Sequence, residues 1–242
     1  MGKLRSYEGK LPKRLGGNLV IYPMGGDIII RLKSGFTTEE LLHSKKYENC
    51  RKNASEFGRV SKACKGVREA LVGILPRQNN LTIVNTFTKF MSSLLSFDTE
   101  HIKGDRTIAT ALQNAEALQL FTSYSFNPDT TLVLNFEVIG HQLQLSNFTL
   151  PEGISWMGFR LHAVAYDWDT FTGTLHSGGW HFEQHCTSKQ LYPLPTLETT
   201  QKPVIYILEA QPFDEKEGAF IPVRTEEKGV LVVGYLENNG EE

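Results

Sequence analysis

The stretch TLVLNFEV, residues 131–138, marks the point where the sequence changes from a helical to a strand-like pattern. Every even-numbered position in it is apolar and most odd-numbered positions are polar, which is the period of a strand with one buried face. Similar runs follow at 143–145, 156–168, 174–186, 203–211, 220–224 and 229–236. About six or seven antiparallel strands of this kind predict an immunoglobulin-like β-sandwich domain over residues 127–242.

Before residue 127 the apolar positions recur at steps of three and four, as they do on one face of a helix. Thr37 and Glu40 have the spacing of a capping box, in which each side chain accepts a hydrogen bond from the backbone N–H of the other residue. We therefore predict a helical region over residues 37–126, with about three helices at 37–75, 80–97 and 106–120.

The first 36 residues are rich in glycine and hold two short apolar runs, at 19–22 and 28–30. They predict a glycine-rich β arm over residues 1–36, built on a hairpin with a loop of about five residues. Because a lone hairpin is at best marginally stable in water, the arm must lie against the rest of the chain or another molecule. The whole chain is thus predicted to be α+β. The candidate interaction residues of the arm are Leu19, Val20, Ile21, Tyr22, Ile28, Ile29 and Ile30.

With 242 residues, 40% of them hydrophobic and 21% charged, the chain has the composition of a globular protein and not of a disordered or collagen-like one. Its three cysteines are too few for a disulfide scaffold. It has no run of about 18 apolar residues that could span a membrane. No apolar signal-peptide region follows the basic start, so we expect a cytoplasmic protein or a component of an assembled particle.

Charge is distributed unevenly along the chain. Residues 1–70 hold 15 Lys or Arg against 7 Asp or Glu, whereas residues 71–242 hold 10 against 20. A basic segment of this kind can meet nucleic acid phosphates or the acidic part of another copy. A nucleic-acid-binding protein is therefore one alternative. Its basic face would consist of Lys45, Lys46, Arg51, Lys52, Arg59 and Lys62.

The sequence has no motif for nucleophilic catalysis, phosphate binding or dinucleotide binding, so we expect neither an enzyme nor a cofactor. The residues best suited to a metal ion are Asp167, His176, His181 and His185. In an extended strand His181 and His185 would stand about 13 Å apart, which is too far for both to bind one zinc ion. We therefore predict no metal centre.

Aromatic residues offer a second alternative, a β-sandwich module that binds a carbohydrate or a peptide. Trp156, Tyr166 and Trp168 fall on one face of a predicted strand, and aromatic rings at a surface can form a platform for such ligands. The opposing interpretation is that these rings are buried in the core.

The opening of the chain also resembles known sequences. The residues concerned are Gly9-Lys10-Leu11, the run from Gly16 to Tyr22, Ile30-Arg31, and a following helix with Tyr47, Arg51 and Phe57. Here the chain resembles uncharacterised Bacteroidota proteins of unknown function with a glycine-rich N-terminal arm and, distantly, phage virion structural proteins. The resemblance implies a bacterial protein with an arm, then helices, then a β-rich C-terminal region. It carries over no catalytic residue.

Together these features predict a non-enzymatic structural or assembly protein. An exposed apolar hairpin can add to the sheet edge of another molecule, which satisfies its backbone groups and buries its side chains. The basic first third would meet the acidic remainder of another copy, so head-to-tail contacts would build a homo-oligomer or a filament. The expected partner is another copy of the chain or another protein.

Overall fold

The computed structural model describes residues 2–4, 19–24, 26–32, 37–76, 80–127, 130–148, 150–184, 189–197 and 202–237. The chain forms two compact units, Met1–Arg51 and Lys52–Glu242, called here the N-terminal unit and the main unit. Helices and antiparallel sheets both occur, which confirms the predicted α+β class. Within the described ranges no helix is both long enough and apolar enough to cross a membrane.

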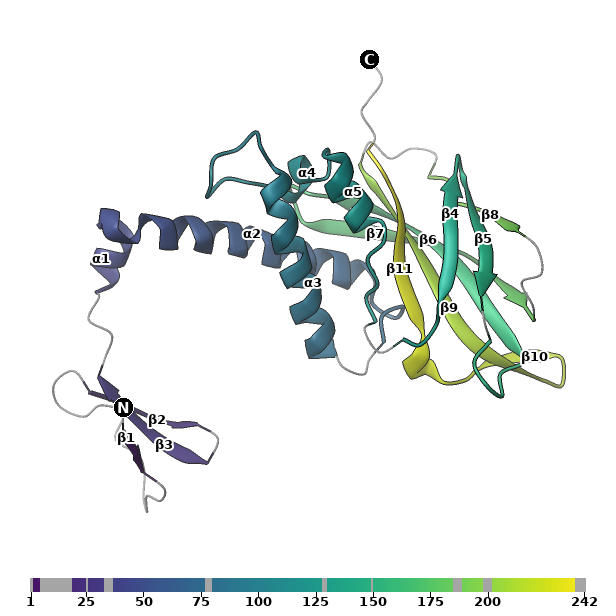
Figure 1. The fold of residues 1–242 in the computed structure, drawn as a ribbon, viewed down its shortest axis with the longest axis horizontal. Coiled ribbons are helices and arrows are strands. Elements are labelled where there is room, and N and C mark those ends of the chain that lie inside the picture. Colours follow the sequence, from purple (N-terminus) through teal and green to yellow (C-terminus); the bar gives the residue numbers. More distant parts are fainter. Residues whose placement is uncertain are drawn as a thin grey trace. The chain divides into compact units, whose positions relative to one another are not determined.

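The N-terminal unit contains a small antiparallel sheet of β1 (Gly2–Leu4), β2 (Leu19–Met24) and β3 (Asp27–Leu32), in the order β1-β3-β2 (Figure 1). The predicted hairpin is confirmed, but its loop is shorter than the five residues expected, because Met24 pairs with Asp27. Gly26 lies in the turn with φ +83°, a conformation that glycine adopts without strain. The sequence pattern does not indicate β1.

The short helices α1 (Thr38–His43) and η1 (Lys45–Tyr47) follow the small sheet. The predicted capping box is present, since the Glu40 N–H donates to Thr37 Oγ1 (3.1 Å) and the Thr37 N–H donates to Glu40 Oε2 (2.9 Å). The first predicted helix is interrupted, because the backbone is extended at Ser44 (ψ 134°) before α2 (Glu48–Ala70) begins.

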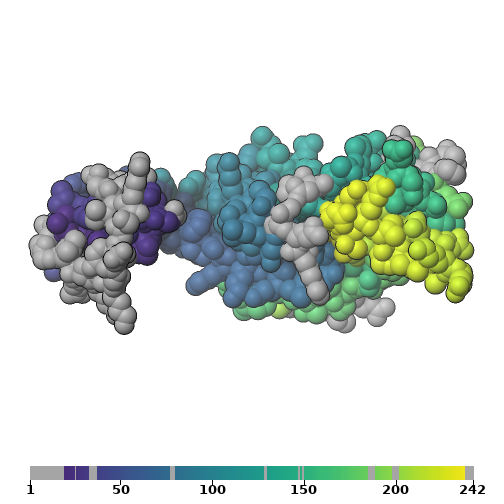
Figure 2. Space-filling model, turned by 90° about the horizontal axis from the view of Figure 1, so that it is seen from below, coloured from purple at the N-terminus to yellow at the C-terminus, as the bar shows by residue number. Residues whose placement is uncertain are grey.

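The main unit has further helices after α2. α3 (Asn80–Leu94) and the short helix η2 (Leu95–Phe97) match the second predicted helix. The third predicted helix is divided into α4 (Ile108–Ala111) and α5 (Ala115–Phe121). The division falls at Asn114, whose side chain accepts the N–H groups of Glu116 and Ala117 and so begins a new helix. Figure 2 shows α2 and α3, in blue, at one face of the main unit.

Two antiparallel sheets form the C-terminal part of the main unit. The larger sheet pairs β7 (Thr172–Glu183), β6 (Trp156–Asp167) and β9 (Val204–Lys216) in that order, and β10 (Ala219–Pro222) and β11 (Gly229–Leu236) both pair with β9. The smaller sheet has the order β4 (Leu134–Ile139), β5 (Gln142–Phe148), β8 (Gln190–Pro193). Most of these strands match predicted runs, but β8 is additional and β9 continues past residue 211.

The larger sheet is covered on both faces. Along β6 and β9, side chains such as Val164 and Ile207 share a core cluster with α2, α3 and α5. Side chains such as Leu161 and Leu208, which point to the other face, pack with the smaller sheet. The C-terminal part is thus a two-sheet sandwich with a layer of helices on the outer face of the larger sheet.

Candidate functional site

The small sheet of the N-terminal unit carries both predicted interaction runs, one on β2 and one on β3. Residues directly opposite each other in an antiparallel pair point to the same face of the sheet. One face therefore carries three opposed pairs, which are Leu19 with Leu32, Ile21 with Ile30, and Pro23 with Ile28. All six of these residues are apolar, and we call this surface the apolar face.

The opposite face of the small sheet is mixed in character. Its opposed pairs are Val20 with Arg31, Tyr22 with Ile29, and Met24 with Asp27. The Arg31 guanidinium lies over the Tyr22 ring, 5.7 Å from the ring centre. Ile29 is fully buried.

The side chains of the apolar face are not buried. Leu32 is 72% exposed and Leu19 is 39% exposed, while Ile21, Ile28 and Ile30 are half-buried. Among the residues of the N-terminal unit that the structure describes, Ile29 alone is buried. The described part of the unit therefore exposes apolar surface and contains one core residue, Ile29.

The predicted basic face is partly occupied by bonds to backbone carbonyl groups. Arg51 Nη1 donates to two carbonyl oxygens at the end of α1, at 2.8 and 2.9 Å. Arg59 Nη2 donates to the carbonyl oxygen of Gly104. Of the remaining residues, Lys52 is half-buried, and the exposed ones are Lys45, Lys46 and Lys62.

The predicted platform of Trp156, Tyr166 and Trp168 needs correction. Tyr166 is fully buried, and its hydroxyl donates to the Ala63 carbonyl oxygen on α2 (2.8 Å), so its ring is not available to a ligand at the surface. Trp168 is half-buried and packs against the same core. Trp156 stands at the other end of β6, edge-on to Phe220 with ring centres 5.1 Å apart. The three rings differ in burial because the helical layer covers the end of β6 that carries Tyr166 and not the end that carries Trp156.

The candidate metal ligands within the described residues do not gather into one site. His176 and His181 are exposed on β7, Asp167 is at the end of β6, and His185 lies outside the described residues. In the part of the chain that the structure describes, no three His, Cys, Asp or Glu side chains come together closely enough to hold a metal ion.

Asp167 instead organises the turn between β6 and β7. Its Oδ1 accepts the N–H groups of Thr170 (3.0 Å) and Asp169 (2.9 Å), and its Oδ2 lies 3.2 Å from Lys202 Nζ. The bond from the Thr170 N–H and, after it, those from Asp169 and Lys202 lower the pKa of Asp167 to about 2. The carboxylate is therefore a turn-forming group that stays ionised.

The larger sheet also holds a buried charged group that the sequence analysis did not identify. His162 Nε2 on β6 lies 3.0 Å from Glu209 Oε2 on β9, and Lys228 Nζ donates to Glu209 Oε1 (2.7 Å). Burial raises the pKa of Glu209, but the bonds from His162 and Lys228 outweigh it, so the pKa lies below its ordinary value. One feature of the sequence indicates this group, which is that Glu209 interrupts an apolar run. A carboxylate in a buried strand needs hydrogen-bond or charge partners.

Ser177 extends this group, because its Oγ lies 2.9 Å from His162 Nδ1. Serine, imidazole and carboxylate in series are also the components of a hydrolase triad. Here the imidazole of His162 is fully buried, and the Glu209 carboxylate is shared with Lys228. The geometry is that of a buried ion-pair network that joins β6, β7 and β9.

A cavity of about 340 Å³ lies in the main unit, among α2, the start of α4 and the β6–β7 turn. Its charged lining residues are Arg59, Arg106 and Asp169. Its apolar lining comes from Val60, Ala63, Leu95, Ile108, Ala109, Trp168 and Phe171. The cavity thus combines an apolar interior with a few charged groups, as small-molecule sites do.

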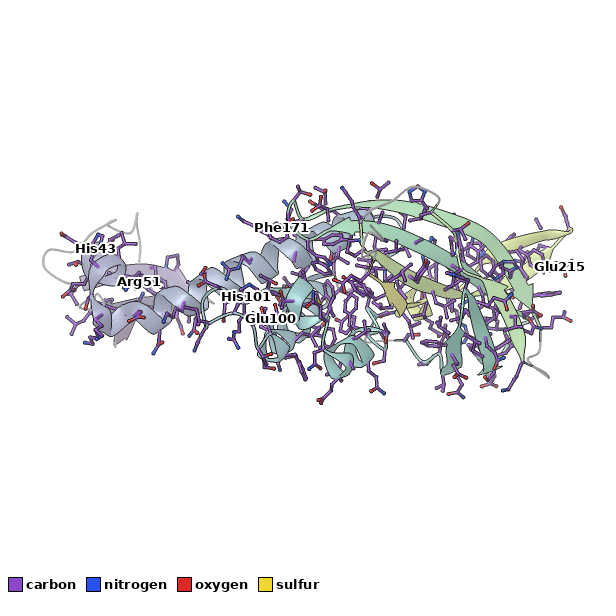
Figure 3. The ribbon with its side chains drawn as sticks, turned by 90° about the horizontal axis from the view of Figure 1, so that it is seen from above. His43, Arg51, Glu100, His101, Phe171 and Glu215 are labelled. Atoms are coloured by element: carbon purple, nitrogen blue, oxygen red, sulfur yellow. The ribbon has the colours of Figure 1, made fainter. Side chains whose placement is uncertain are left out.

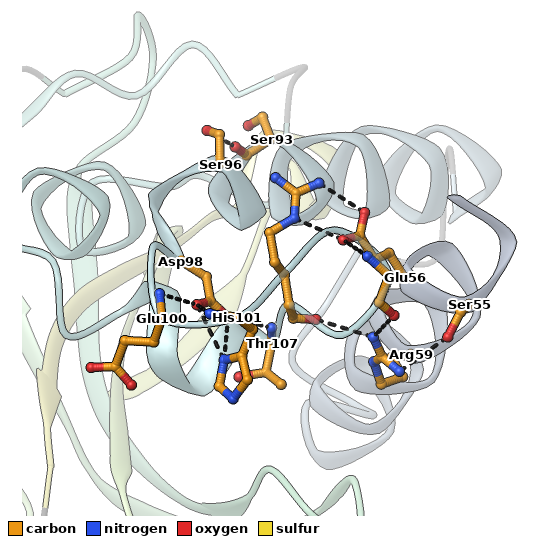
Figure 4. A network of polar contacts seen from close by, with 11 residues as sticks. Ser55, Glu56, Arg59, Ser93, Ser96, Asp98, Glu100, His101 and Thr107 are labelled. Carbon is orange, nitrogen blue, oxygen red and sulfur yellow. Dashed lines mark hydrogen bonds and ion pairs between the residues drawn. The ribbon is translucent and has the colours of Figure 1, made fainter. Parts of the chain in front are cut away.

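A network of polar contacts holds one wall of this cavity (Figure 4). Arg106 binds Glu56 through two parallel bonds, Nε to Oε1 (2.7 Å) and Nη2 to Oε2 (2.8 Å). Glu56 Oε1 also accepts the Gly104 N–H (2.8 Å). The bond from Arg106 lowers the pKa of Glu56 and burial offsets this only in part. Asp98 Oδ2 accepts the Thr107 N–H (2.8 Å), which fixes the start of α4.

Neither a family model nor a curated protein nor a solved structure matches the chain. What the protein does must therefore follow from its own residues and their geometry.

Proposed function

We propose that the protein is a non-enzymatic assembly protein whose N-terminal unit binds the main unit of another copy through its apolar face. The observation that carries this proposal is that every side chain of the apolar face is apolar and none is buried. Burying apolar surface contributes roughly 25 cal/mol per Å². Contiguous apolar patches on soluble proteins commonly mark interaction surfaces.

The small size of the sheet supports the same proposal. Its longest strands have six residues, and Ile29 is the one buried residue among those described in the unit. A sheet of this size needs a second layer for stability. A neighbouring copy supplies that layer.

Charge indicates which part of the neighbouring copy is the partner. The N-terminal unit holds 10 Lys or Arg against 5 Asp or Glu, and the main unit holds 15 against 22. Two N-terminal units repel each other, whereas an N-terminal unit and a main unit attract. Complementary charge of this kind steers association and fixes orientation. Contact between unlike surfaces is head-to-tail and builds a ring or a filament.

The test compares two lysine substitutions on opposite faces of the small sheet. Leu32 is 72% exposed on the apolar face, and Met24 is 57% exposed on the mixed face. Both Leu32→Lys and Met24→Lys add one positive charge at an exposed position. Sedimentation velocity over a range of protein concentrations should show that Leu32→Lys shifts the chain towards monomer while Met24→Lys assembles as the unmodified chain does. Equal assembly of all three would argue against the apolar face as the contact surface.

A further inference from the structure

The cavity lies within the main unit, and none of its lining residues belongs to the apolar face. Its volume of about 340 Å³ is at the lower end of the range of small-molecule pockets, roughly 300–1,000 Å³. We propose that it binds a small monocarboxylate with an aromatic or branched apolar body. Arg59 donates to the carboxylate, and the apolar body lies among the side chains that include Leu95, Ile108 and Trp168.

Arg59 supplies the binding group because, among the described residues, nothing balances its charge and one of its donors has no acceptor. Its Nη1 donates to Ser55 Oγ (3.1 Å), and its Nη2 donates to the carbonyl oxygens of Gly104 and, at 3.5 Å, Arg106, so all three acceptors are neutral. Its Nε is buried and finds no acceptor in the part of the chain that the structure describes. Among the described residues no carboxylate pairs with it. A buried donor without an acceptor and a half-buried cation without a counter-ion both cost free energy, which a bound carboxylate offsets.

The other charges around the cavity favour a single negative charge on the ligand. Arg106 is already neutralised by its two bonds to Glu56. Asp169, at the cavity lining, is exposed and negative. One available guanidinium beside an exposed carboxylate suits a monoanion and disfavours a phosphate dianion.

The β6–β7 turn gives the apolar part of the cavity a fixed shape. Phe171 has φ 57°, a left-handed conformation that is unfavourable for a residue with a side chain. It is held there beside α2 (Figure 3), where the missing side chain of Gly66 lets the Phe171 carbonyl approach the helix. Residues held in such conformations cluster at ligand sites. Trp168 and Phe171 both lie in this turn and both line the cavity.

The experiment uses phenylacetate as the probe and phenylacetamide as its neutral isostere, with the full-length protein and saturation-transfer difference NMR. Hydrogen bonds to charged groups are stronger than those between neutral groups, so we expect the amide to bind about tenfold more weakly or worse. Inorganic phosphate, added as a competitor, should not displace phenylacetate. Equal binding of acid and amide, displacement by phosphate, or no binding of phenylacetate would each overturn the proposal.

Variants then locate the bound probe. Ala109→Phe fills the cavity, which Ala109 lines, and should abolish binding. Arg59→Gln should reduce phenylacetate binding to the level of the amide. Lys62→Gln is the matched control, because it removes a positive charge from α2 at an exposed residue that is not among those lining the cavity. Unchanged binding in Ala109→Phe, or an equal loss in Lys62→Gln, would contradict the assignment. The comparison of acid with amide needs no variant and so does not depend on how each variant folds.

Discussion

Replacing Gly66 with alanine should destabilise the main unit, although the same change elsewhere on α2 should stabilise it. A Cβ at Gly66 would overlap the Phe171 carbonyl oxygen and lie 2.7 Å from the Tyr166 hydroxyl oxygen. The overlap is with backbone, so it cannot be relieved by a side-chain rotation. At Gly58, on the same helix, no atom lies within 4 Å of the added Cβ.

The magnitudes follow from these contacts. Gly66→Ala gains about 1 kcal/mol of helix propensity. It loses about 1–3 kcal/mol through overpacking and about 1–3 kcal/mol if the buried Tyr166 hydroxyl can no longer donate to Ala63. The net loss is therefore about 1–5 kcal/mol, and about 2 kcal/mol if the Tyr166 bond is only weakened, whereas Gly58→Ala should gain about 0.5–1 kcal/mol.

Thermal unfolding followed by tryptophan fluorescence is the appropriate assay, because all three tryptophans lie in the main unit. A change of 1 kcal/mol shifts the Tm of a domain of this size by about 2–4 °C. We expect Gly66→Ala to lower Tm by about 4–8 °C and Gly58→Ala to raise it slightly. If Gly66→Ala raised Tm as Gly58→Ala does, the close packing of the β6–β7 turn on α2 would be refuted.

Three further predictions concern buried charge, pH and turn geometry. Glu209→Leu should lower the free energy of unfolding in urea by about 3 kcal/mol, because it leaves Lys228 without its counter-ion. Adding Lys228→Met to this variant should recover part of that loss. If the losses of the two substitutions were strictly additive, the ion pair would be contradicted. The pKa of Glu56 lies below its ordinary value of 4.5, so the ionised carboxylate stabilises the protein at neutral pH, and this stabilisation is lost as the pH falls through and below 4.5. In urea unfolding from neutral to acidic pH, the free energy of unfolding should therefore decline less in Glu56→Gln than in the unmodified chain. An equal decline in both would contradict the ion pair. Glu217 and Gly218 form a tight turn with φ 53° and 77°, a conformation for which Asn-Gly is the preferred pair. Glu217→Asn should therefore raise the free energy of unfolding by about 0.5–1 kcal/mol. A decrease in Tm would show that Glu217 does not have this left-handed conformation.

The fold could be predicted from the sequence where the signal is local. The period of two after residue 131 predicts the strands of the C-terminal part, and the Thr37–Glu40 capping box predicts the start of α1. The divided third helix was missed because the capping by Asn114 competes with a continuous apolar pattern. β8 was missed because it has only four residues and its pairing with β5 is set by the tertiary structure.

The apolar face could not be predicted from the sequence, because it depends on the register of the strand pair. A loop of five residues would pair Tyr22 with Ile28, whereas the observed register pairs Tyr22 with Ile29. A shift of one residue in a strand pair changes which side chains share a face. The seven predicted interaction residues therefore divide between the two faces of the sheet: Leu19, Ile21, Ile28 and Ile30 lie on the apolar face, and Val20, Tyr22 and Ile29 lie on the mixed face.

The cavity could not be predicted from any local pattern. Its lining comes from four separate segments of the sequence, around Arg59, Leu95, Arg106 and Trp168. Arg59 was grouped instead with the basic residues of a solvent-facing helix, because sequence alone does not show that its guanidinium is held against Gly104.

The most direct test of the proposed assembly is the molar mass of the intact chain, measured by light scattering at increasing concentration, beside that of a chain lacking residues 1–36. We predict that the intact chain exceeds its monomer mass of 27.3 kDa and grows with concentration, while the truncated chain remains a monomer. An intact chain that stays monomeric, or a truncated chain that assembles equally well, would contradict association through the N-terminal sheet.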